Sequence, residues 1–180
     1  RGFIVKIIFL DLDGVLNNWY HPDLIDEKNA LVLKKILELS KAKIVITSSN
    51  KYSFQREGQN TVVESFLAQY LKILQEMGIT PFDLTPYCQE DKSLEIKAYL
   101  RSNPQVVDFV IIDDEPVCLD LLKYQVLPDL YKGLSLEHIK PILAILNGKL
   151  GFYPPNYDLT ENSEQRLIRI NRYYNQGNRK

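Results

Sequence analysis

Cysteine and long apolar runs are both scarce in this sequence, and each scarcity excludes a class of protein. The two cysteines, Cys88 and Cys118, have neither the spacing of a metal site nor a partner motif. We therefore expect free thiols in a reducing compartment and a cytoplasmic location. The longest apolar runs, such as IIFL, are far too short to cross a bilayer, so we expect no transmembrane segment. The chain shows no signal-peptide pattern, and its start at Arg1 leaves a trimmed segment or a longer parent protein open.

Net charge is also nearly absent. The formal charge is −1 over 180 residues, so no overall field would attract nucleic acid or anionic lipid. Apolar residues make up 45% and charged residues 25%, which is ordinary for a globular domain. We find no internal repeat and no low-complexity tract. The length fits one domain with a substantial buried core.

Apolar runs that end in polar clusters predict buried strands, and helical patterns lie between them. Strands are expected at 5–10, 43–46 and 106–112, with a shorter one at 79–84. Helices are expected at 27–39, 63–77, 93–101, around 117–123, from 135 and at 161–174. Asp26 would cap the first of these helices, Gly78 would end the second, and Pro141 would weaken the one that begins at 135. This alternation predicts an α/β fold, a three-layer Rossmann-like parallel sheet with helices on both faces. We expect residues 1–150 to form the core and 151–180 a helical extension with a basic tail.

Carboxylates follow the first and third predicted strands. Asp11 and Asp13 come directly after one strand, and Asp113 and Asp114 after the other. Because parallel strands end at one edge of their sheet, these side chains should meet there, where α/β folds bind ligands. Four carboxylates together would be destabilising without a cation, and oxygen ligands suit Mg²⁺. A nearby lysine, hydroxyls and loop amides would add a site for a phosphate dianion.

The same stretches resemble a known family. DLDGV after a buried strand, ITSSN after the second, DKSLEI before a helix and VIIDD at the end of the third resemble the haloacid dehalogenase-like (HAD) superfamily, over about Val5 to Leu146. With GLSLEHI, they look most like the variant found in bacterial RNA-repair proteins. The resemblance implies a HAD-like phosphatase of the capless type.

The resemblance also implies roles for the acids. Asp11 would be the nucleophile that forms an aspartyl-phosphate, and Asp13 would protonate the leaving oxygen and later activate water. Mg²⁺ would be held by the Asp11 carboxylate, the Asp13 backbone carbonyl and Asp113, with Asp114 assisting. An aspartate at position 13 also points to phosphomonoester hydrolysis or phosphotransfer rather than dehalogenation.

Other residues would bind the phosphate. Thr47 or Ser48 would hydrogen-bond a phosphoryl oxygen, and we favour Thr47. Lys92 would neutralise the phosphoryl charge, with Lys97 as its competitor. Gly14 permits a tight turn through which backbone amides can approach the phosphate.

The substrate is expected to be a phosphorylated macromolecule. Related phosphatases often carry a cap domain, but the gaps 14–43 and 50–91 each hold little more than one helix. We therefore expect no sizeable cap and an open site that a macromolecule shields from water. Trp19 and Tyr20 could wall the entrance for a phosphotyrosine ring or a nucleobase. The near-neutral charge favours a phosphoprotein, phosphotyrosine included, over the alternative of a polynucleotide 5′ or 3′ end in nucleic-acid repair.

The last predicted helix offers a weaker hint about partners. It carries Arg166, Arg169 and Arg172 next to tyrosines and could touch nucleic acid or anionic lipid. Acidic Glu161 and Glu164 dilute this charge, so a solvated helix is the preferred interpretation.

Other function classes fit the pattern less well. A glycosyltransferase also uses Asp-x-Asp with a divalent ion, but it would not need Lys92 and the Asp113–Asp114 pair at other strand ends. A calcium loop is disfavoured because apolar and amide residues follow Gly14 and no glutamate closes the loop. A non-catalytic binding module on a HAD fold is the alternative of a different class.

Overall fold

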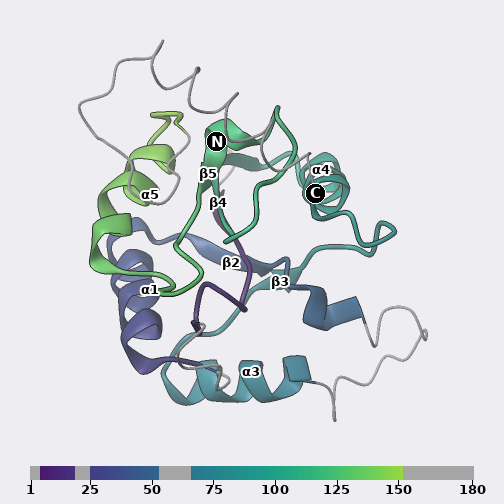
Figure 1. Cartoon of the computed structure of the whole chain (residues 1–180). Coiled ribbons are helices and arrows are strands. Elements are labelled where there is room, and N and C mark those ends of the chain that lie inside the picture. The colour runs from purple at the N-terminus through teal and green to yellow at the C-terminus, as the bar shows by residue number, and fades with distance from the viewer. Residues whose placement is uncertain (1–4, 19–24, 53–65, 152–180) are drawn as a thin grey trace.

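The computed structural model describes residues 5–18, 25–52 and 66–151, and Figure 1 shows their arrangement. Within these ranges, five strands form one parallel sheet in the order β3-β2-β1-β4-β5. The strands are β1 (Val5–Leu10), β2 (Lys43–Ile46), β3 (Asp83–Leu84), β4 (Val106–Ile112) and β5 (Gln125–Val126). The predicted α/β class is confirmed. Because β1 is central, its carboxyl end lies between those of β2 and β4.

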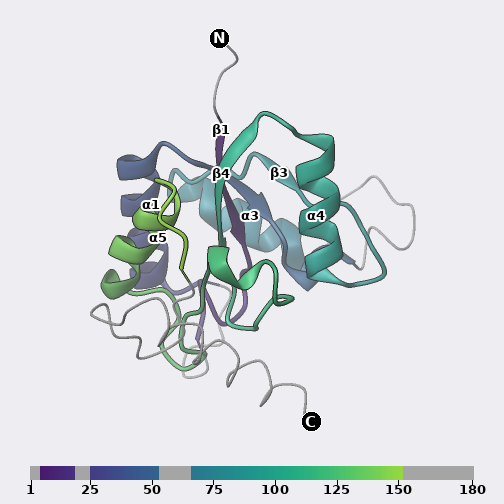
Figure 2. The ribbon, with the colours of Figure 1, turned by 90° about the horizontal axis from the view of Figure 1, so that it is seen from above.

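Helices cover both faces of the sheet, as the two views show (Figures 1 and 2). On one face α1 (Glu27–Ser40), α3 (Phe66–Glu76) and α5 (Ile139–Ile145) join the larger apolar core. On the other face α4 (Lys92–Ser102) packs with the segment 117–127. The layers therefore match the predicted three-layer architecture.

Alternation along β1 explains why a nearly all-apolar strand suits this position. Ile8 and Leu10 belong to the core on the α1 face, while Ile7 and Phe9 belong to the core on the α4 face. All four side chains are fully buried. A strand that is covered on both faces gains from apolar residues at every position.

Side-chain caps fix where two helices begin. Asp26 accepts a hydrogen bond from the backbone N–H of Lys28, and α1 starts one residue later, as predicted. Asp91 accepts from the N–H of Leu94, so α4 begins at Lys92 rather than at the predicted residue 93. This one-residue shift places Lys92 in the first position of a capped helix, next to the carboxyl edge of the sheet.

The predicted helix around 117–123 is wrong. The chain there forms turns and a short 3₁₀ segment, η2 (Leu122–Tyr124), that leads into β5. The side chain of Gln125 bonds the backbone of this segment: its Oε1 accepts from the Val117 N–H, and its Nε2 donates to the backbone carbonyls of Asp113 and Glu115. These bonds satisfy three backbone groups in the turns that lead to β5. The two-residue strand β5 was not predicted because it is too short to show a pattern.

Two further elements differ in detail. The segment predicted as a helix from 135 starts as a 3₁₀ turn, η3 (Leu136–His138), and continues as α5. Pro141 lies in the first turn of α5, where its missing N–H removes no helical hydrogen bond. The strand expected at 79–84 is limited to its last two residues.

Several predictions fall outside the described residues. These are the aromatic wall at Trp19 and Tyr20, the start of the 63–77 helix, and the extension from 152 onward with its basic helix. The described part of the third helix, α3, ends at Glu76, and Gly78 follows with a φ of +75° as a C-terminal cap. Cys88 and Cys118 are free and half-buried. No helix in the described ranges is long and apolar enough to cross a membrane.

Candidate active site

The site lies where β1, β2 and β4 end. The hydrogen bonding of the sheet continues one residue past the strands, because the Asp11 N–H donates to the Ile112 carbonyl and the Thr47 N–H to the Leu10 carbonyl, each at 2.9 Å. Both residues are thus held by the sheet itself rather than by a loop, and both side chains are buried. The topology therefore fixes the nucleophile and hydroxyl candidates before any ligand binds.

Three carboxylates meet at this edge. One oxygen from each of Asp11, Asp113 and Asp114 lies within 4.8 Å of the others. Burial, and next the nearby Asp11 carboxylate, raises the pKa of Asp113 well above its ordinary value. The same two causes raise the pKa of Asp114 to about 6. The cluster is under electrostatic stress that a cation would relieve.

Lys92 supplies part of that relief. Its Nζ lies 3.0 Å from Asp11 Oδ2 and 2.8 Å from Asp113 Oδ2. Burial alone would lower the pKa of Lys92, but the carboxylates of Asp11 and Asp113 outweigh burial and raise it. Lys97, the competing lysine, instead forms an ion pair of 2.9 Å with Asp120 near the surface. Of the two, only Lys92 is in contact with the carboxylate cluster.

The carboxylate set fits a divalent ion such as Mg²⁺. Asp11 Oδ1 is buried and finds no hydrogen-bond partner among the described residues, although a buried carboxylate oxygen normally has one. The three acids offer only oxygen ligands, which Mg²⁺ prefers. An orphaned oxygen within a cluster of acids is what an ion-binding edge presents before the ion is added.

The two candidate hydroxyls differ in their surroundings. Thr47 Oγ1 is buried and, within the described ranges, has no hydrogen-bond partner. Ser48 caps the 3₁₀ turn η1 (Ser49–Lys51), where its Oγ accepts from the Asn50 N–H. Thr47 therefore has the hydroxyl that still needs a partner.

Gly14 is required by conformation and by space. Its φ is +70°, in the left-handed region that favours glycine, and a Cβ on it would overlap the carboxylate of Asp114. Its N–H donates to Asn17 Oδ1 at 2.8 Å, so this amide already has an acceptor. Glycine here lets the turn after Asp13 lie directly against the acid cluster.

Asp13 is not part of the cluster of three acids, and its carboxylate belongs to a hydrogen-bonded group that the sequence did not reveal. Its Oδ1 accepts from Tyr70 Oη at 2.5 Å and from Asn17 Nδ2 at 2.8 Å, and its Oδ2 accepts from Asn50 Nδ2 at 2.9 Å. Burial, and then the bond to Asp13, raises the pKa of Tyr70, so its hydroxyl keeps its proton at neutral pH. In the sequence, Tyr70 lies within the helix predicted at 63–77, and helical spacing there indicates only a core position.

A second missed feature lies behind Thr47. Lys51 and Glu95 form an ion pair of 2.6 Å with both side chains fully buried. Lys51 Nζ also donates to the Thr47 carbonyl, and Glu95 Oε2 accepts from Thr85 Oγ1. Burial lowers the pKa of Lys51, and the bond to Glu95 partly offsets this. The pair ties the ends of β2 and β3 to α4.

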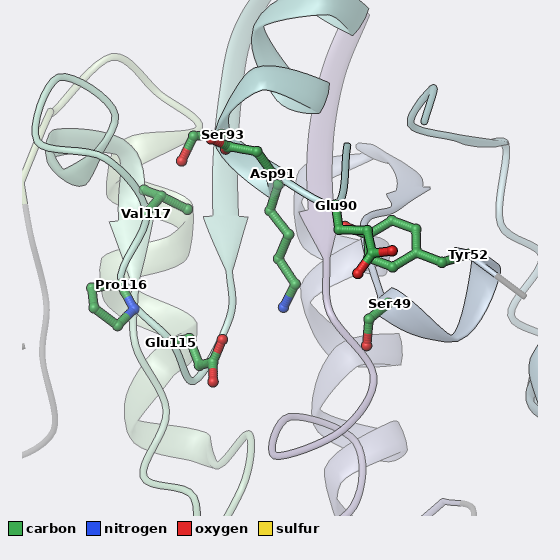
Figure 3. A pocket seen from close by; sticks show the side chains of 9 residues that line it. Ser49, Tyr52, Glu90, Asp91, Ser93, Glu115, Pro116 and Val117 are labelled. Atoms are coloured by element: carbon green, nitrogen blue, oxygen red, sulfur yellow. The ribbon is translucent and has the colours of Figure 1, made fainter. Parts of the chain in front are cut away.

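A cavity of about 520 Å³ opens beside Lys92 (Figure 3). Its lining includes three acidic residues, Glu90, Asp91 and Glu115, together with the hydroxyls of Ser49 and Ser93. In Figure 3, Glu115 lies on one side of the cavity and Glu90 on the other. The cavity is thus rich in hydrogen-bond acceptors.

The turn that carries Glu90 has an unusual backbone. Gln89 and Glu90 have φ values of 55° and 64°, and the Asp91 N–H donates to the Cys88 carbonyl. Glycine, asparagine or aspartate normally occupy both central positions of such a turn. Left-handed conformations of other residues carry strain of about 1–2 kcal/mol each, and such strain concentrates at functional sites.

Comparison with known families identifies the relationship that the motifs suggested. The family described as the HAD domain in Swiss Army Knife RNA repair proteins matches residues 7–139, which include all of the acids, hydroxyls and lysines discussed above. Searches of curated proteins and of solved structures each found no similar protein. The matched range covers most of the 180 residues. The chain therefore belongs to the family of HAD domains found in Swiss Army Knife RNA repair proteins.

Proposed function

We propose that this domain is a Mg²⁺-dependent phosphomonoester hydrolase that works through an aspartyl-phosphate on Asp11. The observation that carries this proposal is the state of Asp11 itself. Lys92 holds its Oδ2, while its buried Oδ1 has no partner among the described residues. A desolvated carboxylate that a lysine holds in one orientation is suited to attack phosphorus.

The first half-reaction transfers the phosphoryl group to Asp11. An Asp11 carboxylate oxygen forms a bond to phosphorus as the bond between phosphorus and the leaving oxygen breaks. The departing oxygen takes the electron pair of that bond and a proton from Asp13. Lys92 and the Thr47 hydroxyl offer positive charge and a hydrogen bond to the phosphoryl oxygens.

The second half-reaction releases phosphate. Water gives a proton to the Asp13 carboxylate and attacks phosphorus, and the bond between phosphorus and the Asp11 oxygen breaks. Inorganic phosphate leaves, Asp11 is again a carboxylate and Asp13 is again protonated. One residue thus acts as acid and then as base, which requires it to stay in place throughout the cycle.

Asp11, Asp113 and Asp114 would hold the Mg²⁺ ion with their carboxylates, together with the backbone carbonyl of Asp13. When bound, the ion offsets the repulsion between the nucleophile and the phosphate. The raised pKa values of Asp113 and Asp114 are consistent with this assignment, because burial and the neighbouring Asp11 carboxylate disfavour their charged forms, which a bound cation would favour.

The substrate we favour is a terminal phosphate of RNA. The family description supports it, since HAD domains of this family occur in RNA repair proteins. In related phosphatases, a cap is inserted in one of two gaps of the chain. In this chain, the described helices of these gaps are α1 and α3, and both contribute to the apolar core. An edge of the sheet that no cap covers within the described residues suits a macromolecular end.

A phosphoprotein is the second candidate, and the cavity beside Lys92 favours it. Lys92 also lines this cavity, but the acidic residues Glu90, Asp91 and Glu115 outnumber it, and they would repel a second phosphate while accepting hydrogen bonds from a peptide. An RNA end would have to direct its next phosphate away from this cavity. The two substrates therefore differ in whether a second phosphate has to be kept out of this cavity.

A substrate panel tests the proposal. Oligoribonucleotides with a 5′ or a 3′ phosphate, and phosphoserine and phosphotyrosine peptides, are incubated with wild type, Asp11→Asn and Asp13→Asn, with Mg²⁺ or with excess chelator. Release of phosphate from an RNA end that needs Mg²⁺ and both aspartates supports the favoured substrate, and release from peptides alone supports the second. Binding of a substrate without turnover would contradict hydrolysis and support the non-catalytic module.

A further inference from the structure

Tyr70 forms a closed hydrogen-bonded triangle with Asp13 and Asn17. Its Oη donates to Asp13 Oδ1 at 2.5 Å and accepts from Asn17 Nδ2 at 2.9 Å. Asn17 Nδ2 also donates to Asp13 Oδ1 at 2.8 Å. Tyr70 comes from α3, more than fifty residues away in sequence, and its side chain is almost fully buried.

We propose that Tyr70 is a positioning residue for Asp13. By bonding Oδ1, Tyr70 leaves Oδ2 as the Asp13 oxygen that delivers and receives the proton. This inference rests on the proposed function, in which Asp13 is the acid and base. Tyr70 touches neither the substrate nor the reacting atoms in this account, and it acts only through Asp13.

The bonding of the two Asp13 oxygens supports this selection. Oδ1 accepts from both Tyr70 and Asn17, which fills the two acceptor positions of a carboxylate oxygen. Among the described residues, Oδ2 accepts from Asn50 alone, so one position remains for a proton. A proton on Oδ2 disturbs none of the three bonds, whereas a proton on Oδ1 would displace a donor.

The rigidity of α3 explains why Tyr70 can hold Asp13. Leu67 and Leu74 lie one turn on either side of Tyr70, and all three belong to the larger core cluster. Asp13 itself is exposed, and an exposed aspartate would otherwise change rotamer freely. The hydroxyl of a core tyrosine therefore gives an exposed acid a fixed orientation.

The leaving group provides a readout that a merely structural role would not move. A nitrophenolate leaves without a proton, whereas an alkoxide, like the ribose oxygen of an RNA end, needs one. Positioned general acids contribute about 10²–10⁴-fold to rates. In Tyr70→Phe we expect kcat/KM to fall on the order of 100-fold for an alkyl phosphate and less than about 10-fold for nitrophenyl phosphate. Equal losses for both substrates would overturn the inference.

Tyr99→Phe is the matched control. Tyr99 is also a buried tyrosine on a helix, and its ring packs edge-on against Phe9 at 5.6 Å, within the opposite core. Removing its hydroxyl should leave the ratio of the two kcat/KM values unchanged. In an Asp13→Asn background, Tyr70→Phe should have no further effect on nitrophenyl phosphate, because the two residues act as one unit. Losses that multiply in the double variant would contradict the proposal.

Crystal structures of wild type and Tyr70→Phe decide the matter independently of turnover. We expect one Asp13 orientation in the wild type and a rotated or doubled side chain in the variant. If wild type shows no Mg²⁺-dependent turnover, the proposed function fails, and the structures still show whether Tyr70 fixes Asp13. An identical Asp13 orientation in both proteins would overturn the positioning role.

Discussion

Lys51 Nζ lies 2.6 Å from Glu95 Oε2, and the two fully buried side chains join the end of β2 to the helix that carries Lys92. Lys51 also bonds the carbonyl of Thr47, so the pair lies directly behind a phosphate-binding candidate. Neither residue is placed to contact a substrate, because both are shielded from solvent. The pair thus connects the segment that carries Thr47 to the helix that carries Lys92.

Breaking this pair should destabilise the fold strongly. Glu95→Ala leaves Lys51 buried without its counter-charge, and loss of one partner of a buried pair typically costs about 3–5 kcal/mol. The free energy of unfolding, measured by urea denaturation, should fall by that amount. The double variant Lys51→Met/Glu95→Leu should recover much of the loss, since it removes both charges. Lys97→Ala, which breaks an exposed pair with Asp120, is the control and should change stability little.

Gly14→Ala should weaken Mg²⁺ binding. The added Cβ would overlap the Asp114 carboxylate, and the alanine would have to adopt a left-handed backbone conformation that costs about 1–2 kcal/mol. Isothermal titration with Mg²⁺ should show a lower affinity than in wild type. Gly148→Ala is a matched control, because Gly148 also has a positive φ but nothing lies within 4 Å of its added Cβ. A Gly14→Ala protein with wild-type Mg²⁺ affinity would refute the close approach of the turn to Asp114.

The contributions of Asp113 and Asp114 to the stability of the metal-free protein should fall as the pH rises from about 4 to 7, whereas His138, whose pKa is lowered by burial, contributes in the opposite direction. The pKa of Asp114 is about 6 in the folded state and 3.8 ordinarily, so between these values the folded chain binds more protons than the unfolded chain. The contribution of Asp114 to stability then decreases with pH, and the raised pKa of Asp113 acts in the same direction. In thermal unfolding with chelator, stability should fall more with rising pH in wild type than in Asp114→Asn, and saturating Mg²⁺ should reduce this difference. The same pH dependence in both proteins would contradict the account.

Asp114→Asn separates stability from metal binding. Removing a carboxylate whose charge is disfavoured should raise the metal-free melting temperature at pH 7 by a few degrees, because like-charge repulsion with Asp11 is lost. The same change should lower Mg²⁺ affinity, measured by calorimetry. A variant that is less stable without metal would show that Asp114 serves the fold rather than the ion.

Glu115→Gln should change selectivity rather than basal turnover. Glu115 is exposed and lines the acidic cavity beside Lys92, where it would repel a second phosphate. We expect kcat/KM to rise about two- to threefold for a nucleoside bisphosphate and to stay unchanged for a monophosphate, since an exposed charge is screened. No difference between the two substrates would place the second phosphate away from this cavity.

The strand-end acids could be predicted from the sequence because a parallel sheet leaves few alternatives. Apolar runs that end in Asp11 and Asp113 must deliver both aspartates to one edge, and the structure brings them together with Lys92. The sequence also favoured Lys92 over Lys97, and the structure places Lys92 in contact with Asp11 and Asp113.

The other features depend on contacts between distant parts of the chain. The spacing of Tyr70 marks a core position, and periodicity does not reveal that its hydroxyl reaches Asp13. Lys51 and Glu95 lie 44 residues apart, and neither has a local pattern that predicts a buried pair. The turns found where a helix was predicted at 117–123 also involve a distant side chain, because Gln125 bonds the backbone of Asp113 and Val117.

Trapping the covalent intermediate tests the central claim, that Asp11 is a phosphoryl acceptor, most directly. Wild type, Asp11→Asn and Asp13→Asn are mixed with nitrophenyl phosphate and Mg²⁺, quenched in acid, and the peptide containing residue 11 is weighed by mass spectrometry. We expect a phosphorylated peptide in wild type, a larger fraction in Asp13→Asn because water is no longer activated, and none in Asp11→Asn. Turnover in wild type with phosphate never found on Asp11, or undiminished turnover in Asp11→Asn, would contradict the account.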